Sequence, residues 1–205
     1  MRQVILAIFV LFSLPVWAFS TSDIEQYYLH PDLYEAKTML QSLSDQNFLD
    51  KNPASIPLIS GFVGGLMTKR RTLIGQFRQM PLSVSMKKLT ERVNKNMADA
   101  GYRLKPYLNM RQIKTPENLD TLWGLFYATG DARIPETIQN YIIEKCQNLS
   151  EAEIDMTSLM ALSSLQENAK YHPLARLALR RTLQSASVQR KLSLIQNFSE
   201  IDGKI

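Results

Sequence analysis

Apolar side chains recur at intervals of three and four residues along most of the chain. This interval places them on one face of an α-helix, and no segment shows the sustained alternation of a half-buried strand. The longest apolar stripe runs through Leu82, Met86, Leu89, Val93 and Met97. The pattern predicts helices near residues 22–29, 31–49, 53–67, 69–79, 81–101, 115–129, 134–147, 151–170, 173–184 and 186–199.

Local signals mark several of the predicted helix ends. Asn52-Pro53 and Thr115-Pro116 each place a capping side chain before a proline in the first helical turn. Gly130 stands where a left-handed C-terminal cap is expected. Because most predicted links are short, consecutive helices are expected to pack antiparallel. The sequence therefore predicts an all-α fold of antiparallel helical hairpins, packed as a compact bundle or a short α-solenoid.

The first 18 residues have the three-part pattern of a secretory signal peptide. Arg2 precedes the apolar run from Val4 to Leu14, and Ala18 offers the small side chain that a signal peptidase accepts. The alternative, an uncleaved membrane anchor, needs about 20 apolar residues, and this run is shorter. We predict a cleavable signal peptide over residues 1–18, a single helical domain over 19–205, and export to the periplasm or beyond.

Positive charge is concentrated in one part of the chain. The whole chain carries a net charge of +5, yet residues 69–114 contain twelve basic residues and only two acidic ones. One interpretation is a solvated surface, partly neutralised by the acidic segments on either side. The other is contact with an anionic surface such as membrane headgroups, lipopolysaccharide or an acidic protein. The candidate contact residues are Lys69, Arg70, Arg71, Lys88, Arg92 and Lys95. The predicted export makes nucleic acid an unexpected partner.

Residues 55–67 form the most apolar stretch after the first 18 residues, and they include Gly61, Gly64 and Gly65. The stretch is too short to span a bilayer. Its glycines would let another helix approach closely in the core, while the neighbouring cations would also suit an element at a membrane interface. We favour the core, because helices that are apolar on all sides are usually buried.

Signatures of catalysis and of metal binding are weak. His30 and His172 each precede a proline and have no second ligand at close spacing, so a turn or capping role is expected and neither metal nor cofactor is predicted. Cys146 is the only cysteine and shares an apolar helix face with Ile138 and Ile142, which favours a buried thiol over a reactive one. The sequence has neither a phosphate-binding glycine loop nor a Gly-x-Ser-x-Gly elbow. No catalytic residue is assigned.

The clearest predicted hairpin runs from Leu119 to Ile143, with its turn at Thr129-Gly130-Asp131. It resembles part of the helix–turn–helix of tetratricopeptide-like solenoids, although its second helix departs from that repeat at Pro135, among other positions. Together with the predicted signal peptide and residues 57–66, it also resembles a group of uncharacterised exported all-helical proteins of Gram-negative bacteria. That resemblance implies an exported helical fold and carries no activity or site residues.

These patterns favour a non-catalytic module that binds a protein or an envelope component in a groove between hairpins. Trp123, Phe126 and Tyr127 are the candidate groove residues, although an aromatic stripe of this kind is more often core. Two alternatives stay open. One is a small exported hydrolase whose acid–base residues meet only in the fold. The other is a peripheral membrane-surface binder that uses the basic residues of 69–114.

Overall fold

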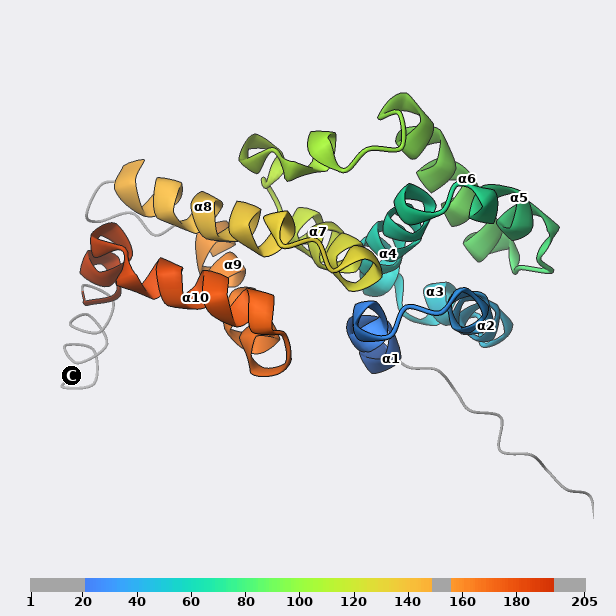
Figure 1. Ribbon diagram of the computed structural model, residues 1–205, viewed down its shortest axis with the longest axis horizontal. Helices are drawn as coiled ribbons and strands as arrows, with labels where there is room; N and C mark the ends of the chain where they lie inside the picture. The colour runs from blue at the N-terminus through green and yellow to red at the C-terminus, as the bar shows by residue number, and fades with distance from the viewer. Residues whose placement is uncertain (1–20, 149–155, 194–205) are drawn as a thin grey trace, which may run out of the picture.

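The computed structural model describes residues 21–148 and 156–193 (Figure 1). Every regular element of these residues is a helix, which confirms the predicted all-α fold class. The predicted signal peptide lies outside the described residues.

Short helices surround one long apolar helix in the first half of the chain. In order they are α1 (Thr21–Gln26), η1 (Tyr27–Leu29), α2 (Leu33–Asp45), α3 (Phe48–Lys51), η2 (Pro53–Ser55), α4 (Ile56–Lys69), α5 (Thr72–Gln79) and α6 (Val84–Asp99), where η marks a 3-10 helix. The sequence predicted a single helix over 31–49. The structure divides it, because Asn47 adopts a left-handed backbone with a φ of 50° between α2 and α3.

The second half begins with two 3-10 turns and continues with long helices. These elements are η3 (Lys105–Leu108), η4 (Met110–Gln112), α7 (Pro116–Thr129), α8 (Arg133–Asn148), α9 (Met156–Tyr171) and α10 (Pro173–Gln184), followed by a helical stretch over 186–193. Thr115 and Pro116 begin α7 as predicted, and the Thr115 backbone N–H donates to the Asn118 side chain at 3.2 Å. Gly130 ends α7 in the left-handed conformation, with a φ of 62°, which confirms the predicted cap.

Two helices that are distant in sequence, α4 and α7, form the centre of the molecule (Figure 1). Their backbones touch at glycines. A Cβ atom on Gly61 would lie 2.0 Å from the carbonyl oxygen of Thr121, and one on Gly124 would lie 2.0 Å from that of Leu58. Any side chain larger than hydrogen at these two positions would therefore force the helices apart. Gly61, Gly64 and Gly65 are all buried, so the structure confirms the core interpretation of this apolar stretch.

The pairing of α4 with α7 is parallel. Gly61 faces Thr121 and Leu125, and Gly65, one turn later, faces Leu125 and Ala128, so the contacts advance in the same direction on both helices. Short links cannot join parallel neighbours, and here the link from α4 to α7 consists of α5, α6, η3 and η4. The expected packing of consecutive helices is seen in the second half, where α8, α9 and α10 pack on one another at one end of the molecule (Figure 1).

Candidate functional site

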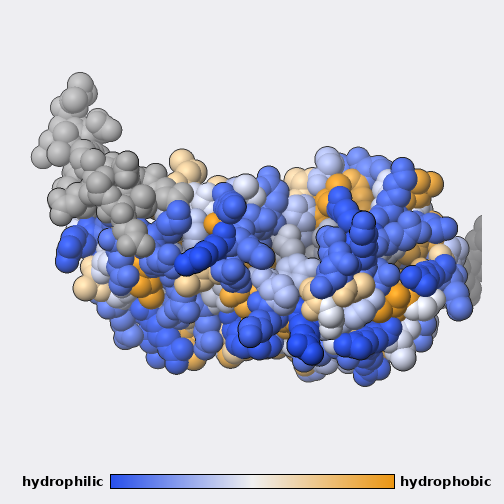
Figure 2. Space-filling model, turned by 90° about the horizontal axis from the view of Figure 1, so that it is seen from above, coloured by the Kyte–Doolittle hydropathy of each residue, from blue (hydrophilic) through white to orange (hydrophobic). Residues whose placement is uncertain are grey.

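The basic segment, residues 69–114, comprises the end of α4, all of α5, α6, η3 and η4, and the links between them. In Figure 1 it occupies the green region at the right and top of the molecule. Figure 2 looks down on the side where η3, η4 and α8 lie, and hydrophilic residues cover most of this surface with small hydrophobic areas between them. All twelve basic residues of the segment are exposed.

All six candidate contact residues for an anionic surface have exposed side chains. On α6, residues 86, 89, 93 and 97 face the core, while Lys88, Arg92 and Lys95 share an exposed face. Arg71 has an internal role, because its guanidinium donates to the Gly101 carbonyl at 3.3 Å and lies over the Tyr102 ring. The Arg71 side chain thus joins the start of α5 to the end of α6.

The cations of the basic segment form no close ion pair with a carboxylate in the described part of the chain, although Lys69 is near enough to Asp131 to lower the pKa of that carboxyl. Among the described residues, ion pairs join Arg133 to Asp131, Lys170 to Glu167 and Arg181 to Glu136, and none of these cations belongs to the segment. Five of the six candidate contact residues also make no side-chain hydrogen bond within the described part of the chain; they are Lys69, Arg70, Lys88, Arg92 and Lys95. The sequence allowed neutralisation by the flanking acidic segments, and among the described residues close pairing of this kind does not occur.

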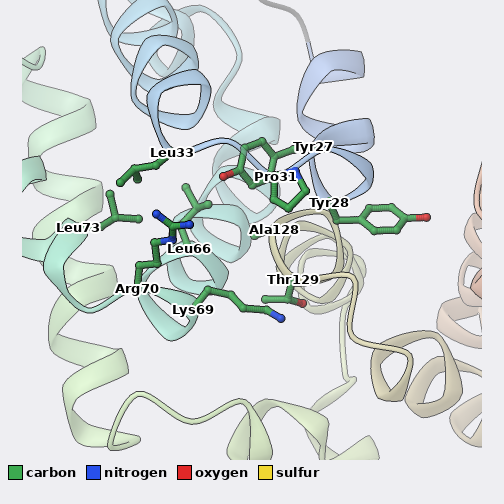
Figure 3. Close-up of a pocket in the computed structure, with 10 residues that line it drawn as sticks. All are labelled: Tyr27, Tyr28, Pro31, Leu33, Leu66, Lys69, Arg70, Leu73, Ala128 and Thr129. Carbon is green, nitrogen blue, oxygen red and sulfur yellow. The ribbon is translucent and has the colours of Figure 1, made fainter.

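A pocket of about 200 Å³ opens where the basic segment meets the N-terminal helices (Figure 3). Its walls come from η1, the start of α2, the end of α4, α5 and the end of α7. Leu33, Leu66 and Leu73 form an apolar part, and Lys69 and Arg70 provide two positive charges. In Figure 3 the Arg70 side chain extends into the space between Leu33 and Tyr27, and that of Lys69 extends toward Thr129. The pocket therefore combines an apolar lining with cations, and sequence reasoning found only the cations, because the lining comes from separate helices.

Two of the other pockets that adjoin the same segment contain charged side chains. One, of about 370 Å³, lies between α4, α5 and α6 and includes Arg78, Lys87 and Glu91. The other, of about 410 Å³, lies between η4 and α8, with Arg111, Lys114 and Lys145 beside Glu144. Each of these two pockets contains a carboxylate beside its cations, which makes it less suited to an anion than the pocket at Lys69 and Arg70.

The candidate groove residues Trp123, Phe126 and Tyr127 are core residues, with exposed fractions of 3%, 0% and 4%. Trp123 and Tyr127 face α9, where the Trp123 indole N–H donates to Ser164 Oγ at 3.1 Å and the Tyr127 hydroxyl donates to Asn168 Oδ1 at 2.6 Å. Phe126 packs instead against Tyr28 and His172. Within the described residues these three side chains are covered on all sides and offer no surface to a partner. A core position was the alternative stated for these residues, but the sequence did not indicate that α9 would cover Trp123 and Tyr127.

His172 completes this aromatic cluster, and its burial was not predicted. Its side chain is 1% exposed, and its ring lies 5.5 Å from those of Phe126 and Tyr127. The Tyr28 hydroxyl lies 3.0 Å from His172 Nδ1, so η1 and the start of α10 meet here. The position before Pro173 suggested a cap, but the imidazole makes no capping hydrogen bond to α10.

Stability is expected to fall as the solution becomes more acidic than about pH 6.5, because burial lowers the pKa of His172. The unfolded chain then binds a proton that the folded chain resists, so acid favours unfolding by at most about 1.4 kcal/mol per pH unit. Tyr28 and Tyr127 face the imidazole, and Glu25 acts on Tyr127; burial raises the pKa of all three. Burial gives Glu25 the opposite effect, because its raised pKa means that the folded protein binds this proton more readily than the unfolded chain. This effect sets in at more acidic pH, nearer the ordinary Glu25 pKa of 4.5.

The measurement is urea unfolding at pH 7.5 and pH 5.5 for the wild type and for His172→Phe, which should lose most of the difference between the two values. His30, the only other histidine, is exposed, so His30→Gln should change stability equally at both pH values. An unchanged pH dependence in His172→Phe would contradict the assignment to His172.

Other chemistry-bearing groups are dispersed. Cys146 is half-buried, and burial raises the pKa of its thiol while Lys191 acts in the opposite direction. Burial also raises the pKa of the Asp120 carboxyl, but neither Asp120 nor Glu25 lines a pocket described above. The described residues contain no cluster of three or more His, Cys, Asp or Glu side chains that could hold a metal ion. Among the same residues, no helix is long and apolar enough to cross a membrane.

No protein-family model matches the sequence, and comparison with curated proteins and with solved structures gives no significant match. The resemblance to exported helical proteins therefore stays a prediction.

Proposed function

We propose that this protein is a non-catalytic module of the cell envelope that binds an anionic membrane surface through its basic segment. One observation carries the proposal. The exposed cations of residues 69–114 have no carboxylate partner within ion-pair distance in the described part of the chain. Like charges repel one another and destabilise a compact state, so an uncompensated group of this size favours an external anionic partner.

A membrane suits this arrangement better than a small ligand does. The cations are spread over α5, α6 and the links that follow, and a lipid surface presents many negative charges over a comparable area. The strongly exposed large apolar side chains include only Val84 from this segment. Attachment would therefore be electrostatic rather than by insertion, and it should weaken with added salt, which screens charges beyond about 10 Å at 0.1 M.

Co-sedimentation of the purified protein with vesicles tests the proposal. Vesicles containing anionic phosphatidylglycerol should bind the protein at 50 mM salt, and binding should fall at 300 mM salt or on neutral phosphatidylcholine. Replacing Lys88, Arg92 and Lys95 all by glutamine should weaken binding roughly hundredfold, since each cation at an anionic surface contributes about 1 kcal/mol and each 1.4 kcal/mol is a factor of ten.

The matched control replaces three exposed cations outside the segment, Lys51, Arg180 and Arg190, with glutamine. Both variants have the same net charge. Equal losses in the two variants would show that net charge alone drives binding, and equal binding to both vesicle types would also refute the proposal.

A further inference from the structure

The pocket beside Lys69 and Arg70 has an amphipathic lining. Leu33, Leu66 and Leu73 supply its apolar part, and each comes from a different helix. Leu66 and Leu73 are 3% and 1% exposed and form the fixed floor of the pocket, while its accessible apolar surface comes from half-buried Leu33 and from Tyr28 and Pro31 beside it. A space of about 200 Å³ lies below the roughly 300–1,000 Å³ that drug-sized ligands occupy. It therefore suits one short segment of a ligand and not a large molecule.

The two cations at this pocket make no hydrogen bond or ion pair with the rest of the described chain. Lys69 ends α4 and Arg70 is its C-cap residue, where cations commonly hydrogen-bond the last carbonyl groups of a helix. Neither side chain makes such a bond, or an ion pair, within the described part of the chain. The Tyr27 hydroxyl donates to the Asp32 carbonyl oxygen at 2.9 Å, and the nearby Arg70 guanidinium acts on it only through its charge. Lys69 acts on Asp131 in the same way, and Asp131 is itself paired with Arg133. The N–H donors of Lys69 and Arg70 are therefore available to an anion.

We propose that this pocket binds the end of a single-chain anionic amphiphile, with a carboxylate or phosphate headgroup at Lys69 and Arg70 and the adjoining methylene groups against the three leucines. Guanidinium groups bind carboxylate and phosphate oxygens in a bidentate manner, and ammonium adds a second positive charge. The apolar wall makes the bound chain favourable, at about 0.8 kcal/mol for each buried methylene group. Recognition requires both halves of the ligand. The inference rests on the proposed function, in which the same segment faces anionic lipid.

Isothermal titration calorimetry with four soluble probes tests the site. Octanoate and octyl phosphate carry the charge and the chain, acetate carries only the charge, and octanol carries only the chain. We expect at least one of the first two to bind and the last two to bind at least about tenfold more weakly; the stronger of the octyl anions identifies the headgroup. Equal binding of octanol, or no binding of either octyl anion, would overturn the proposal.

Two variants with the same charge change assign the binding to this pocket. Arg70→Gln should weaken binding of the octyl anion at least about tenfold, because it removes a charge-assisted contact. Arg78→Gln, an exposed cation of the same segment on another pocket, should leave it unchanged. Equal affinity in Arg70→Gln and the wild type would also overturn the site.

The α6 triple variant separates this inference from the proposed function. Glutamine at Lys88, Arg92 and Lys95 should reduce vesicle binding and leave octyl-anion binding intact. Arg70→Gln should reduce octyl-anion binding at least about tenfold but weaken vesicle binding only about fivefold, because it removes one of the twelve cations of the segment, at about 1 kcal/mol each. If the protein binds anionic vesicles but neither octyl anion, the pocket inference alone is refuted. If it binds an octyl anion but not anionic vesicles, the membrane proposal alone is refuted.

Discussion

Gly61→Ala is expected to destabilise the folded protein by at least about 3 kcal/mol, the upper part of the usual range for overpacked cores. The added methyl group would lie 2.0 Å from the Thr121 carbonyl oxygen and 2.9 Å from its carbonyl carbon. These are backbone atoms in the middle of α7, so they cannot rotate away as the end of a side chain could. The two helices would have to separate, and α4 and α7 make the most extensive helix contact in the described chain. Urea unfolding followed by circular dichroism measures the loss.

Gly64→Ala provides a matched control in the same helix. A Cβ atom at Gly64 would lie 3.4 Å from Met97 Sδ and 3.5 Å from Val93 Cγ1, which are ordinary van der Waals distances to side chains. Alanine is the better helix former by about 0.8–1.0 kcal/mol, so this variant should be as stable as the wild type or more stable. Equal stability of Gly61→Ala and Gly64→Ala would contradict a direct backbone contact between α4 and α7 at Gly61.

The periodicity of apolar residues predicted the helices themselves, because a helix records its buried face in its own sequence. The end of α7 at Gly130 was also predictable, because glycine favours the left-handed conformation that ends a helix. The parallel pairing of α4 with α7 was not predictable in this way. It depends on a contact between residues about 60 positions apart, and the sequence of α4 indicated only that some helix would approach its glycines.

The candidate site shows the same division between local and distant information. The clustered cations at 69–114 are visible in the sequence, and their exposure follows from the apolar stripe on the other face of α6. Whether acidic segments would neutralise them depended on where α1, α7 and α8 lie. The pocket at Arg70 depended on Leu33 and Leu73 meeting across helices. His172 gave no signal beyond the proline that follows it, and its burial arises from Tyr28, 144 residues earlier in the chain.

Phe126→Ala is expected to destabilise the protein by about 3–5 kcal/mol, the usual cost of truncating a buried phenylalanine. The Phe126 ring is 0% exposed and lies 4.8 Å from the ring of Tyr28, 5.7 Å from that of Trp123 and 5.5 Å from that of His172. Its removal therefore leaves a cavity among rings from η1, α7 and the start of α10. These segments cannot close the cavity easily, because hydrogen bonds from Trp123 to Ser164 and from Tyr127 to Asn168 fix α7 against α9. Urea unfolding again gives the change in stability.

Tyr34→Ala is the control for this second prediction, because Tyr34 is an aromatic residue on α2 with 79% of its surface exposed, and its loss should change stability by no more than about 0.5 kcal/mol. The pair also decides between core and groove for the aromatic stripe of α7. A core role predicts that Phe126→Ala lowers stability while vesicle binding by the remaining folded protein is unchanged. A groove role predicts the opposite, namely unaltered unfolding and weaker binding, and that result would return Trp123, Phe126 and Tyr127 to the candidate binding surface.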